Sequence, residues 1–344
     1  MNNKGIALIL VLLVLVLLMV IVLEFSFAIR VEVNAARNFS DEVKCYFYAQ
    51  TGFQRAIAEL IKQLTFKETI AEEGTIWRDD QRSITMAIGQ GSVEVLISNE
   101  KGKYDINTIP EDLLRSLVGS LGVEEVERDT ITDSILDWRD EDNLHRLNGA
   151  EDDYYESLTH PYDSKDAPFE TVEELLLVRG VTPSIFYGSF AMGDDTEGSP
   201  PLRKGLVDLM TVYSRSNRVD VNSAPKEILM SIPGINEEVA TKIIDARKEK
   251  PLKDLTEIRA AVGDAAYMLA FQYLSFSSSS IVSIIATGSM RDSGVKRRVK
   301  GIVRINLRTP EKYQIIYWAD NYPNAQNIIP ISRNLWEKSE GEFS

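Results

Sequence analysis

The sequence predicts an α+β protein: one long N-terminal helix packs on a small antiparallel sheet, and a large all-α domain is inserted between the strands of that sheet. Three observations predict this. No proline interrupts residues 6–65, strand-like alternation occurs at 82–99 and again from residue 281, and the text between these segments is helix-like. The length of 344 residues fits about two globular units.

The start of the predicted helix has the character of a membrane anchor. Residues 6–23 are an unbroken apolar run, which covers roughly 27 Å at about 1.5 Å per helical residue. The run is longer than the apolar region of a secretory signal peptide, and Arg30 marks its far boundary, so we expect a retained single-pass transmembrane segment at 6–29. Lys4 precedes the span, which favours a short cytoplasmic N-terminus and places the bulk of the chain outside the cytoplasm.

Apolar residues at helical spacing continue the pattern to about residue 65. They form a stripe of Phe39, Val43, Tyr46, Phe53, Ile57, Leu60 and Leu64. We therefore predict one continuous helix of about 60 residues. The alternative is an anchor followed by a separate soluble helix, because Gly52 is a weak point in the run.

The predicted strands fall into two groups. Alternating apolar residues at 82–99, with Gly89-Gln90-Gly91 in the middle, predict a β-hairpin. Further strands are expected within residues 276–320, followed by a solvated tail at 321–344. The inserted helical domain accordingly covers 105–275, and residues 30–104 hold the rest of the helix and the hairpin.

The inserted segment contains an internal repeat. Residues 105–114 align with residues 220–229, and in both copies Asn and then Thr or Ser stand just before a proline at an expected helix start. Each copy continues into an apolar-glycine turn and a second helix, which resembles the helix-hairpin-helix motif, best over 229–247. Such hairpins can bind DNA phosphates, but residues 226–250 carry five basic and five acidic side chains, so we favour a packing role.

Composition limits the chemistry. The formal net charge of −14 disfavours general attraction to nucleic acid, and neither nucleic acid nor a small-molecule substrate is expected as a partner. One cysteine, Cys45, and two histidines exclude a zinc site built from thiolates and imidazoles. No nucleophile elbow is present, so we expect no enzymatic activity, and a carboxylate-based hydrolase ranks last among the alternatives.

Seven carboxylates fall between residues 137 and 153, and only Arg139 and Arg146 offset them. Bringing these oxygens together without a cation would cost several kcal/mol. Ca²⁺ accepts six to eight oxygen ligands in flexible loops and suits this composition better than softer metals. The spacing is not that of an EF-hand. The alternative is a solvated acidic loop whose charges point apart.

The N-terminus resembles that of type IV prepilin-like proteins, with a very short leader ending at Lys4-Gly5 before an uninterrupted apolar helix. The resemblance implies a leader of residues 1–5, cleavage by prepilin peptidase between Gly5 and Ile6, and N-methylation of Ile6. Leu10 stands where most such proteins carry a glutamate. In lacking this glutamate, the chain resembles the K-class minor pseudopilin of type II secretion, the member of the family that characteristically lacks it.

Four further strings resemble the K class: residues 137–142, 149–155, 169–181 and 221–225. The resemblance implies a pilin-like fold and a non-enzymatic tip or initiation subunit of the periplasmic pseudopilus, anchored in the bacterial inner membrane. It implies minor pseudopilins of the I and J classes, other pseudopilus subunits and prepilin peptidase as partners. It also implies structural calcium in the helical domain, carried by Asp137, Asp140, Asp142, Glu151 and Asp152. The alternative function is a membrane-anchored helix-hairpin-helix DNA-binding protein of a DNA-uptake or type IV pilus system.

Overall fold

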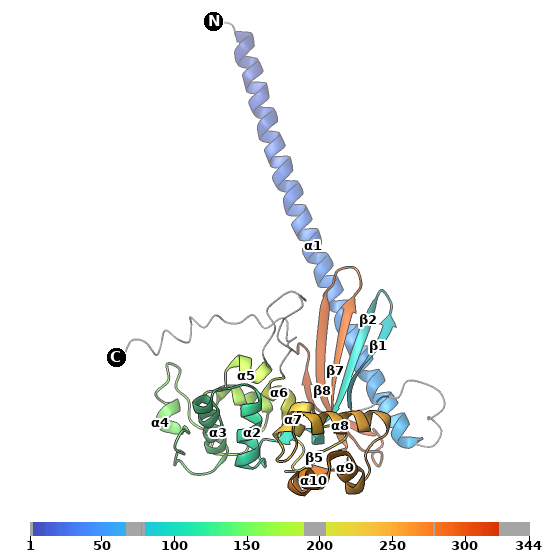
Figure 1. Cartoon of the computed structure of the whole chain (residues 1–344). Coiled ribbons are helices and arrows are strands. Elements are labelled where there is room, and N and C mark those ends of the chain that lie inside the picture. Colours follow the sequence, from blue (N-terminus) through green and yellow to red (C-terminus); the bar gives the residue numbers. More distant parts are fainter. Residues whose placement is uncertain (1–2, 67–76, 78–79, 189–203, 278, 323–344) are drawn as a thin grey trace.

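The computed structural model describes residues 3–66, 77, 80–188, 204–277 and 279–322 (Figure 1). Helix α1 (Asn3–Thr65) is continuous, so the alternative of a separate soluble helix is wrong. From residue 10 to residue 40 every side chain is exposed, and Figure 1 shows this part projecting as a free shaft. By length and composition the shaft holds an apolar window able to cross a membrane, none of it buried.

The sheet is antiparallel, with its five strands in the order β1-β2-β7-β8-β9. Their bounds are β1 (Asp80–Ile88), β2 (Gly91–Asn99), β7 (Ile281–Met290), β8 (Lys296–Ile305) and β9 (Tyr313–Ala319). Strands β2 and β7 are neighbours in register from Gly91↔Met290 to Asn99↔Val282. A large segment therefore leaves the sheet after β2 and returns at β7, which confirms the predicted α+β fold with an insertion between strands.

The lower part of α1 packs against one face of this sheet. Phe53, Ala49 and Ile57 from the helix meet Val95 and Ile284 from the strands in one apolar cluster. Helix and sheet approach closely at Gly288, where an added Cβ would lie 2.0 Å from the carbonyl oxygen of Cys45. Only glycine fits there, so the sequence itself sets how near the helix backbone comes to β7.

The inserted segment is mainly helical and has a separate apolar core, which includes Leu114, Ile131, Ile135 and Leu229. Its α-helices are α2 (Glu111–Ser120), α3 (Glu125–Arg139), α4 (Asp152–Tyr155), α5 (Pro183–Tyr187), α6 (Leu206–Leu209), α7 (Lys226–Ser231), α8 (Glu237–Glu249), α9 (Leu255–Val262) and α10 (Asp264–Ala270). Three 3₁₀ turns accompany them: η1 (Glu100–Gly102), η2 (Val172–Leu177) and η3 (Phe271–Tyr273).

The prediction that this domain is all-α is wrong in one respect, because two short parallel ladders occur within it. Strand β3 (Tyr104–Asp105) pairs with β4 (Met210–Thr211), and β5 (Val219–Asp220) pairs with β6 (Leu274–Ser275). All these residues except Ser275 are buried, so their backbone groups need partners, and the ladders supply them. Each ladder lies at the start of one repeat copy.

Buried polar contacts join the two cores. Lys103 and Glu100 form an ion pair of 2.7 Å with both side chains almost fully buried, and the hydroxyl of Thr211 donates to Glu100 Oε2 at 2.5 Å. From β9, the hydroxyl of Tyr317 donates to Glu173 Oε1 in η2 at 3.1 Å. These contacts fix the inserted domain to the sheet at the end of the molecule away from the free end of α1 (Figure 1).

Candidate functional site

Both repeat copies begin with the same aspartate turn. In the first copy, Asp105 Oδ1 accepts from the backbone N–H of Asn107 at 3.0 Å. The backbone carbonyl of Asp105 accepts from the backbone N–H of Ile109 at 2.8 Å. In the second, Asp220 Oδ1 accepts from Asn222 N–H at 3.4 Å, and its carbonyl accepts from Ala224 N–H at 2.9 Å. The turn satisfies the backbone just before each helix start.

An arginine closes each copy. Arg139, the last residue of α3, donates to the carbonyls of Ile106 and Ile109, the second at 3.0 Å. Arg247, near the end of α8, donates to the carbonyls of Val221 and Ala224 at 2.6 and 2.7 Å. The guanidinium fork thus ties the second helix of each copy back to its starting turn. Arg139 donates to these carbonyls and forms no described ion pair with the acidic loop that follows it, although the charge of Asp140 acts on it.

An asparagine then fastens a later segment to each copy. The Asn107 amide donates to Phe169 O at 3.0 Å and accepts from Phe169 N–H at 2.8 Å. Asn222 pairs in the same way with Leu252, at 2.9 and 2.8 Å. Residues 140–168 lie between Arg139 and Phe169, whereas only residues 248–251 lie between Arg247 and Leu252. The first copy therefore holds a long acidic loop between two fixed points.

The hairpin of the second copy turns its apolar side inward. Leu229, Ile232 and Ile235 are buried in the domain core. The side chain of Asn236 caps α8 by accepting from Val239 N–H, and the first turn of α8 carries Glu237 and Glu238. A phosphate approaching this helix start would meet two carboxylates, so the local charge disfavours nucleic acid.

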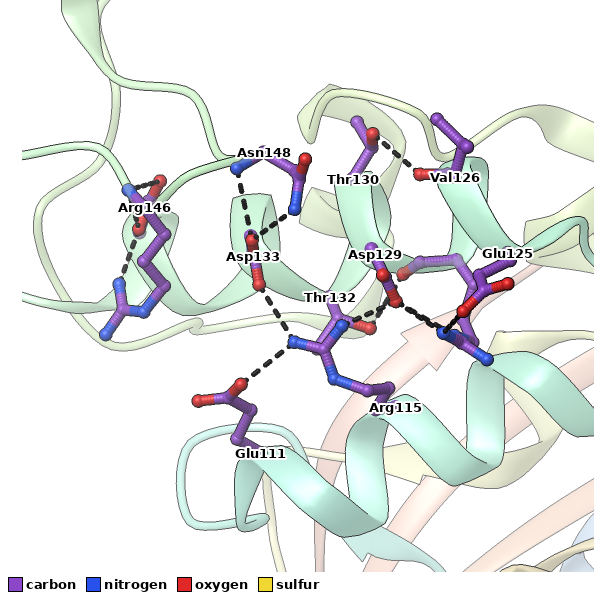
Figure 2. A network of polar contacts seen from close by, with 12 residues as sticks. Glu111, Arg115, Glu125, Val126, Asp129, Thr130, Thr132, Asp133, Arg146 and Asn148 are labelled. Carbon is purple, nitrogen blue, oxygen red and sulfur yellow. Dashed lines mark hydrogen bonds and ion pairs between the residues drawn. The ribbon is translucent and has the colours of Figure 1, made fainter.

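Helix α3 carries carboxylates at four-residue spacing, at positions 129, 133 and 137. Figure 2 shows the first two engaged by Arg115 of α2, whose guanidinium binds Asp129 at 2.5 Å, Asp133 at 3.2 Å and Glu111 at 2.9 Å. The other oxygen of Asp133 accepts from the backbone and amide of Asn148. These carboxylates are fully engaged by protein groups.

Asp137 belongs to a second network, around Arg146. The Arg146 Nη1 atom lies 2.5 Å from Asp137 Oδ1 and 2.7 Å from Asp140 Oδ2. The Arg146 backbone N–H also donates to Asp137 Oδ2 at 3.1 Å. Asp137 is completely buried, while the Arg146 side chain is 37% exposed. An added Cβ on Gly149 would lie 1.7 Å from Asp137 Oδ2, so glycine is required beside this carboxylate.

Glu151 lies beside this network without a counter-charge of its own. It is 1% exposed, and neither carboxylate oxygen has a hydrogen-bond partner among the residues described. Burial raises the pKa of Glu151 to about 7; the nearby Ser164 hydroxyl acts in the opposite direction, and the like charges of Asp137, Asp166 and Asp140 add to the rise. Asp140 Oδ1 is likewise buried and unpartnered within the described part of the chain. Three carboxylate oxygens thus lack a partner in one place.

Two of the five predicted ligands, Asp142 and Asp152, already accept hydrogen bonds from other residues of the loop. Asp142 Oδ1 accepts from Leu144 N–H at 3.0 Å. Asp152 Oδ1 accepts from the backbone and hydroxyl of Ser164, and its Oδ2 accepts from Asn143. Over the described ranges, no three Asp, Glu, His or Cys side chains already stand in an arrangement that holds a metal ion.

Sequence reasoning missed Asp166, whose charge acts on Glu151 and whose Oδ1 accepts from Ser164 at 2.5 Å. Asp166 lies outside the acidic run of residues 137–153. The one feature of the sequence that could have pointed to it is its position just before Phe169, whose backbone Asn107 binds. The predicted processing site lies elsewhere: Gly5 and Ile6 fall in the first turns of α1, with a helical backbone.

Two family models match the chain. The model described as Type II secretion system (T2SS), protein K matches residues 93–187, which include the first repeat copy and the acidic loop. The model described as Helix-hairpin-helix motif matches residues 214–263, which include the second copy. The predicted helix-hairpin-helix resemblance over 229–247 lies within this second match.

Curated relatives carry the same name as the first model. Type II secretion system protein K of Aeromonas hydrophila is 41% identical over 78 residues, which are 22% of this chain and 24% of the relative. The protein of that name from Pectobacterium carotovorum subsp. carotovorum is 27% identical over 121 residues, 31% of this chain and 37% of the relative. The matches thus span about a quarter to a third of these relatives' lengths.

A solved structure shares the fold. The chain is similar to one in the crystal structure of the GspK-GspI-GspJ complex from the type 2 secretion system of enterotoxigenic Escherichia coli, with a TM-score of 0.55 and 13% identity. The match covers 85% of this chain and all of the other. It supports the pilin-like arrangement of helix, sheet and inserted domain.

Proposed function

We propose that the chain is a member of the type II secretion system protein K family and a minor pseudopilin, a structural subunit of the periplasmic pseudopilus; the family-model match and the curated relatives support this. The observation that carries the proposal is the continuity of α1, whose exposed apolar shaft runs into a helix packed on a pilin-like sheet. This is how a subunit is held in a membrane or a helical fibre by one end and presents a folded domain at the other.

We further propose a place at the tip. The inserted domain lies at the end of the sheet that is distant from the free shaft and extends sideways from it (Figure 1). A domain of this bulk is hard to repeat along a tightly packed fibre, but it fits at an end where nothing stacks above it. The proposed partners are minor pseudopilins of the I and J classes, other pseudopilus subunits and prepilin peptidase.

The proposed location is the inner membrane, with a short cytoplasmic N-terminus, a single span and the bulk in the periplasm. The test is the intact mass and N-terminal sequence of full-length protein from cells with and without prepilin peptidase. We expect peptidase-positive cells to yield a chain beginning at methylated Ile6. An N-terminus at Met1 in both samples would contradict the pseudopilin assignment.

The helix-hairpin-helix match makes DNA binding the second candidate function. The carboxylates Glu237 and Glu238 at the start of α8 argue against it. An electrophoretic mobility shift with full-length protein in detergent at low salt tests it, and tight, salt-sensitive binding would favour it over the leading proposal.

We also propose that the acidic loop binds a structural Ca²⁺ ion. The unpartnered oxygens of Glu151 and Asp140 fit such a cation, and they lie beside the ion pairs that Arg146 forms with Asp137 and Asp140. Bound there, the cation would add positive charge to a cluster in which the ion pairs among the described residues are those of Arg146 with Asp137 and Asp140. Asp142 and Asp152 are weaker candidates, because their oxygens already accept hydrogen bonds from the loop itself.

Thermal unfolding of the full-length protein in detergent tests the calcium proposal. We expect a chelator to lower the melting temperature and added Ca²⁺ to restore it, and we expect Glu151→Gln to remove this response. Glu156→Gln is the matched control, because Glu156 is an exposed carboxylate five residues away. A melting temperature that ignores both chelator and Ca²⁺ would contradict the proposal.

A further inference from the structure

Two arginines serve the carboxylates of α3 in different ways. Arg115 projects from a helix and satisfies carboxylates that also have other protein partners. Arg146 projects from the loop between α3 and α4 and binds Asp137 and Asp140 through the single atom Nη1. Among the described residues, no buried carboxylate oxygen of the Arg115 network lacks a partner, whereas Asp140 Oδ1 and both Glu151 oxygens do.

The charges beside Arg146 do not balance. Asp137, Asp140 and Asp166 all act on Glu151, and Arg146 is the cation bonded to two of these groups. The charge of Asp140 also acts on Arg139, but that guanidinium donates to the carbonyls of Ile106 and Ile109. The Arg146 guanidinium offers donors only in one plane and cannot satisfy four carboxylates. A divalent cation accepts oxygen ligands from several directions and would neutralise more of this charge.

The side chain of Arg146 is free to leave without disturbing the loop. It is 37% exposed, and the neighbouring Leu147 is 93% exposed, so little packs over this stretch. The Arg146 backbone N–H has its own bond to Asp137. That bond can keep the loop in place while the guanidinium moves into solvent.

We propose that the Arg146 guanidinium is a built-in counter-ion that occupies the cation position between Asp137 and Asp140 and is displaced when a divalent cation binds. The inference rests on the proposed calcium binding and goes beyond it, because it assigns Arg146 two opposed effects. Arg146 stabilises the cation-free domain by neutralising buried Asp137, and it weakens cation affinity by competing for the same oxygens.

The test is isothermal titration of CaCl₂ into chelator-stripped full-length protein in detergent, with thermal unfolding in parallel. We expect Arg146→Gln to bind Ca²⁺ at least about tenfold more tightly than the wild type and to melt at a lower temperature in chelator. Arg146→Lys keeps the charge, loses the planar fork and should fall between the two. If Arg146→Gln does not fold without calcium, Arg146→Lys takes its place in the titration.

The matched control is Arg115→Gln, which removes the other arginine of the α3 carboxylates. It should lower the melting temperature equally with and without Ca²⁺ and leave the Kd within twofold of the wild type. A general effect of removing positive charge near α3 would instead tighten binding in both variants and would overturn a specific role for Arg146.

The outcomes separate this inference from the calcium proposal. If the wild type binds Ca²⁺ and Arg146→Gln binds it with equal or lower affinity, the inference is overturned and the calcium proposal stands. If only Arg146→Gln binds, the guanidinium blocks the site and is not displaced, which overturns both the displacement and calcium binding by the native chain. If none of the variants binds, both are overturned.

Discussion

The two repeat copies share one scaffold and differ in what they enclose. Each begins with an aspartate turn, closes with an arginine clamp onto two carbonyls, and fastens a later backbone segment through an asparagine. In the second copy the fastened residue, Leu252, follows almost directly after α8. In the first, the fastened residue is Phe169, and the whole acidic loop intervenes.

This difference indicates how the candidate site is built. The scaffold satisfies its own backbone in both copies, so the loop of residues 140–168 is free to carry groups that the fold does not need. Buried carboxylate oxygens without partners occur in that loop, at Asp140 and Glu151. We infer that the second copy is a packing unit and that the first has the same framework with a binding loop added.

The largest effect should come from Glu151, which has no counterpart in the second copy. Its pKa is raised to about 7 in the folded chain, so the folded state holds this proton more tightly than the unfolded state. Without calcium, stability from this group should fall as pH rises from about 4.5 to about 7 and stay low above that. The loss is on the order of 3 kcal/mol.

Glu151→Gln should remove this dependence and make the chelated protein more stable at pH 8 than the wild type. The measurement is denaturant unfolding in chelator at pH 5 and pH 8. Ser164, Asp137, Asp166 and Asp140 act on Glu151 and remain in the variant, so the difference between the two proteins isolates Glu151. Equal pH profiles for the two proteins would show that its carboxylate carries no such penalty.

The arginine clamps should give the next largest effect, and they test whether the scaffolds are equivalent. Arg139→Met and Arg247→Met each strand two backbone carbonyls, at a cost of about 2–3 kcal/mol. Unfolding in chelator should show similar losses for both. A loss confined to one variant would mean that the two copies are not equivalent frameworks.

Sequence alone predicted the parts of this comparison that depend on periodicity. The long helix followed from the apolar spacing between residues 6 and 65, and the insertion followed from strand alternation on both sides of it. The repeat was visible because Asp, Asn and Pro recur at one offset. The two-residue ladders were missed, since two residues are too few to show a period.

The site was predicted less completely, because its geometry depends on contacts across the loop. Glu151, Asp137 and Asp140 lie together as the acidic run suggested. Asp152 accepts from Ser164, whose hydroxyl also contacts Asp166, and no local pattern in the sequence announces that bond. The position of Arg146 was equally hidden: a count of charges shows that it offsets a carboxylate, but not which one.

Gly149→Ala should cost about 2 kcal/mol, because the new Cβ would overlap Asp137 Oδ2 and push the carboxylate away. Unlike Arg139→Met and Arg247→Met, Gly149→Ala should also weaken the response of the melting temperature to Ca²⁺. Gly119→Ala in α2 is the control, since its Cβ would meet only the flexible side chain of Arg128 at 3.3 Å. An unchanged calcium response in Gly149→Ala would exclude Asp137 from the cation site.

The asparagine pair should give the smallest loss of stability and the sharpest test. Asn107→Ala and Asn222→Ala each remove two hydrogen bonds to backbone, at a net cost of about 1 kcal/mol. Only Asn107 fixes the far end of the acidic loop, near Asp166. Calcium titration should therefore give weaker binding for Asn107→Ala and wild-type binding for Asn222→Ala. Weakening in both would mean that the cation site depends on the stability of the whole domain, and the division into a packing copy and a binding copy would fail.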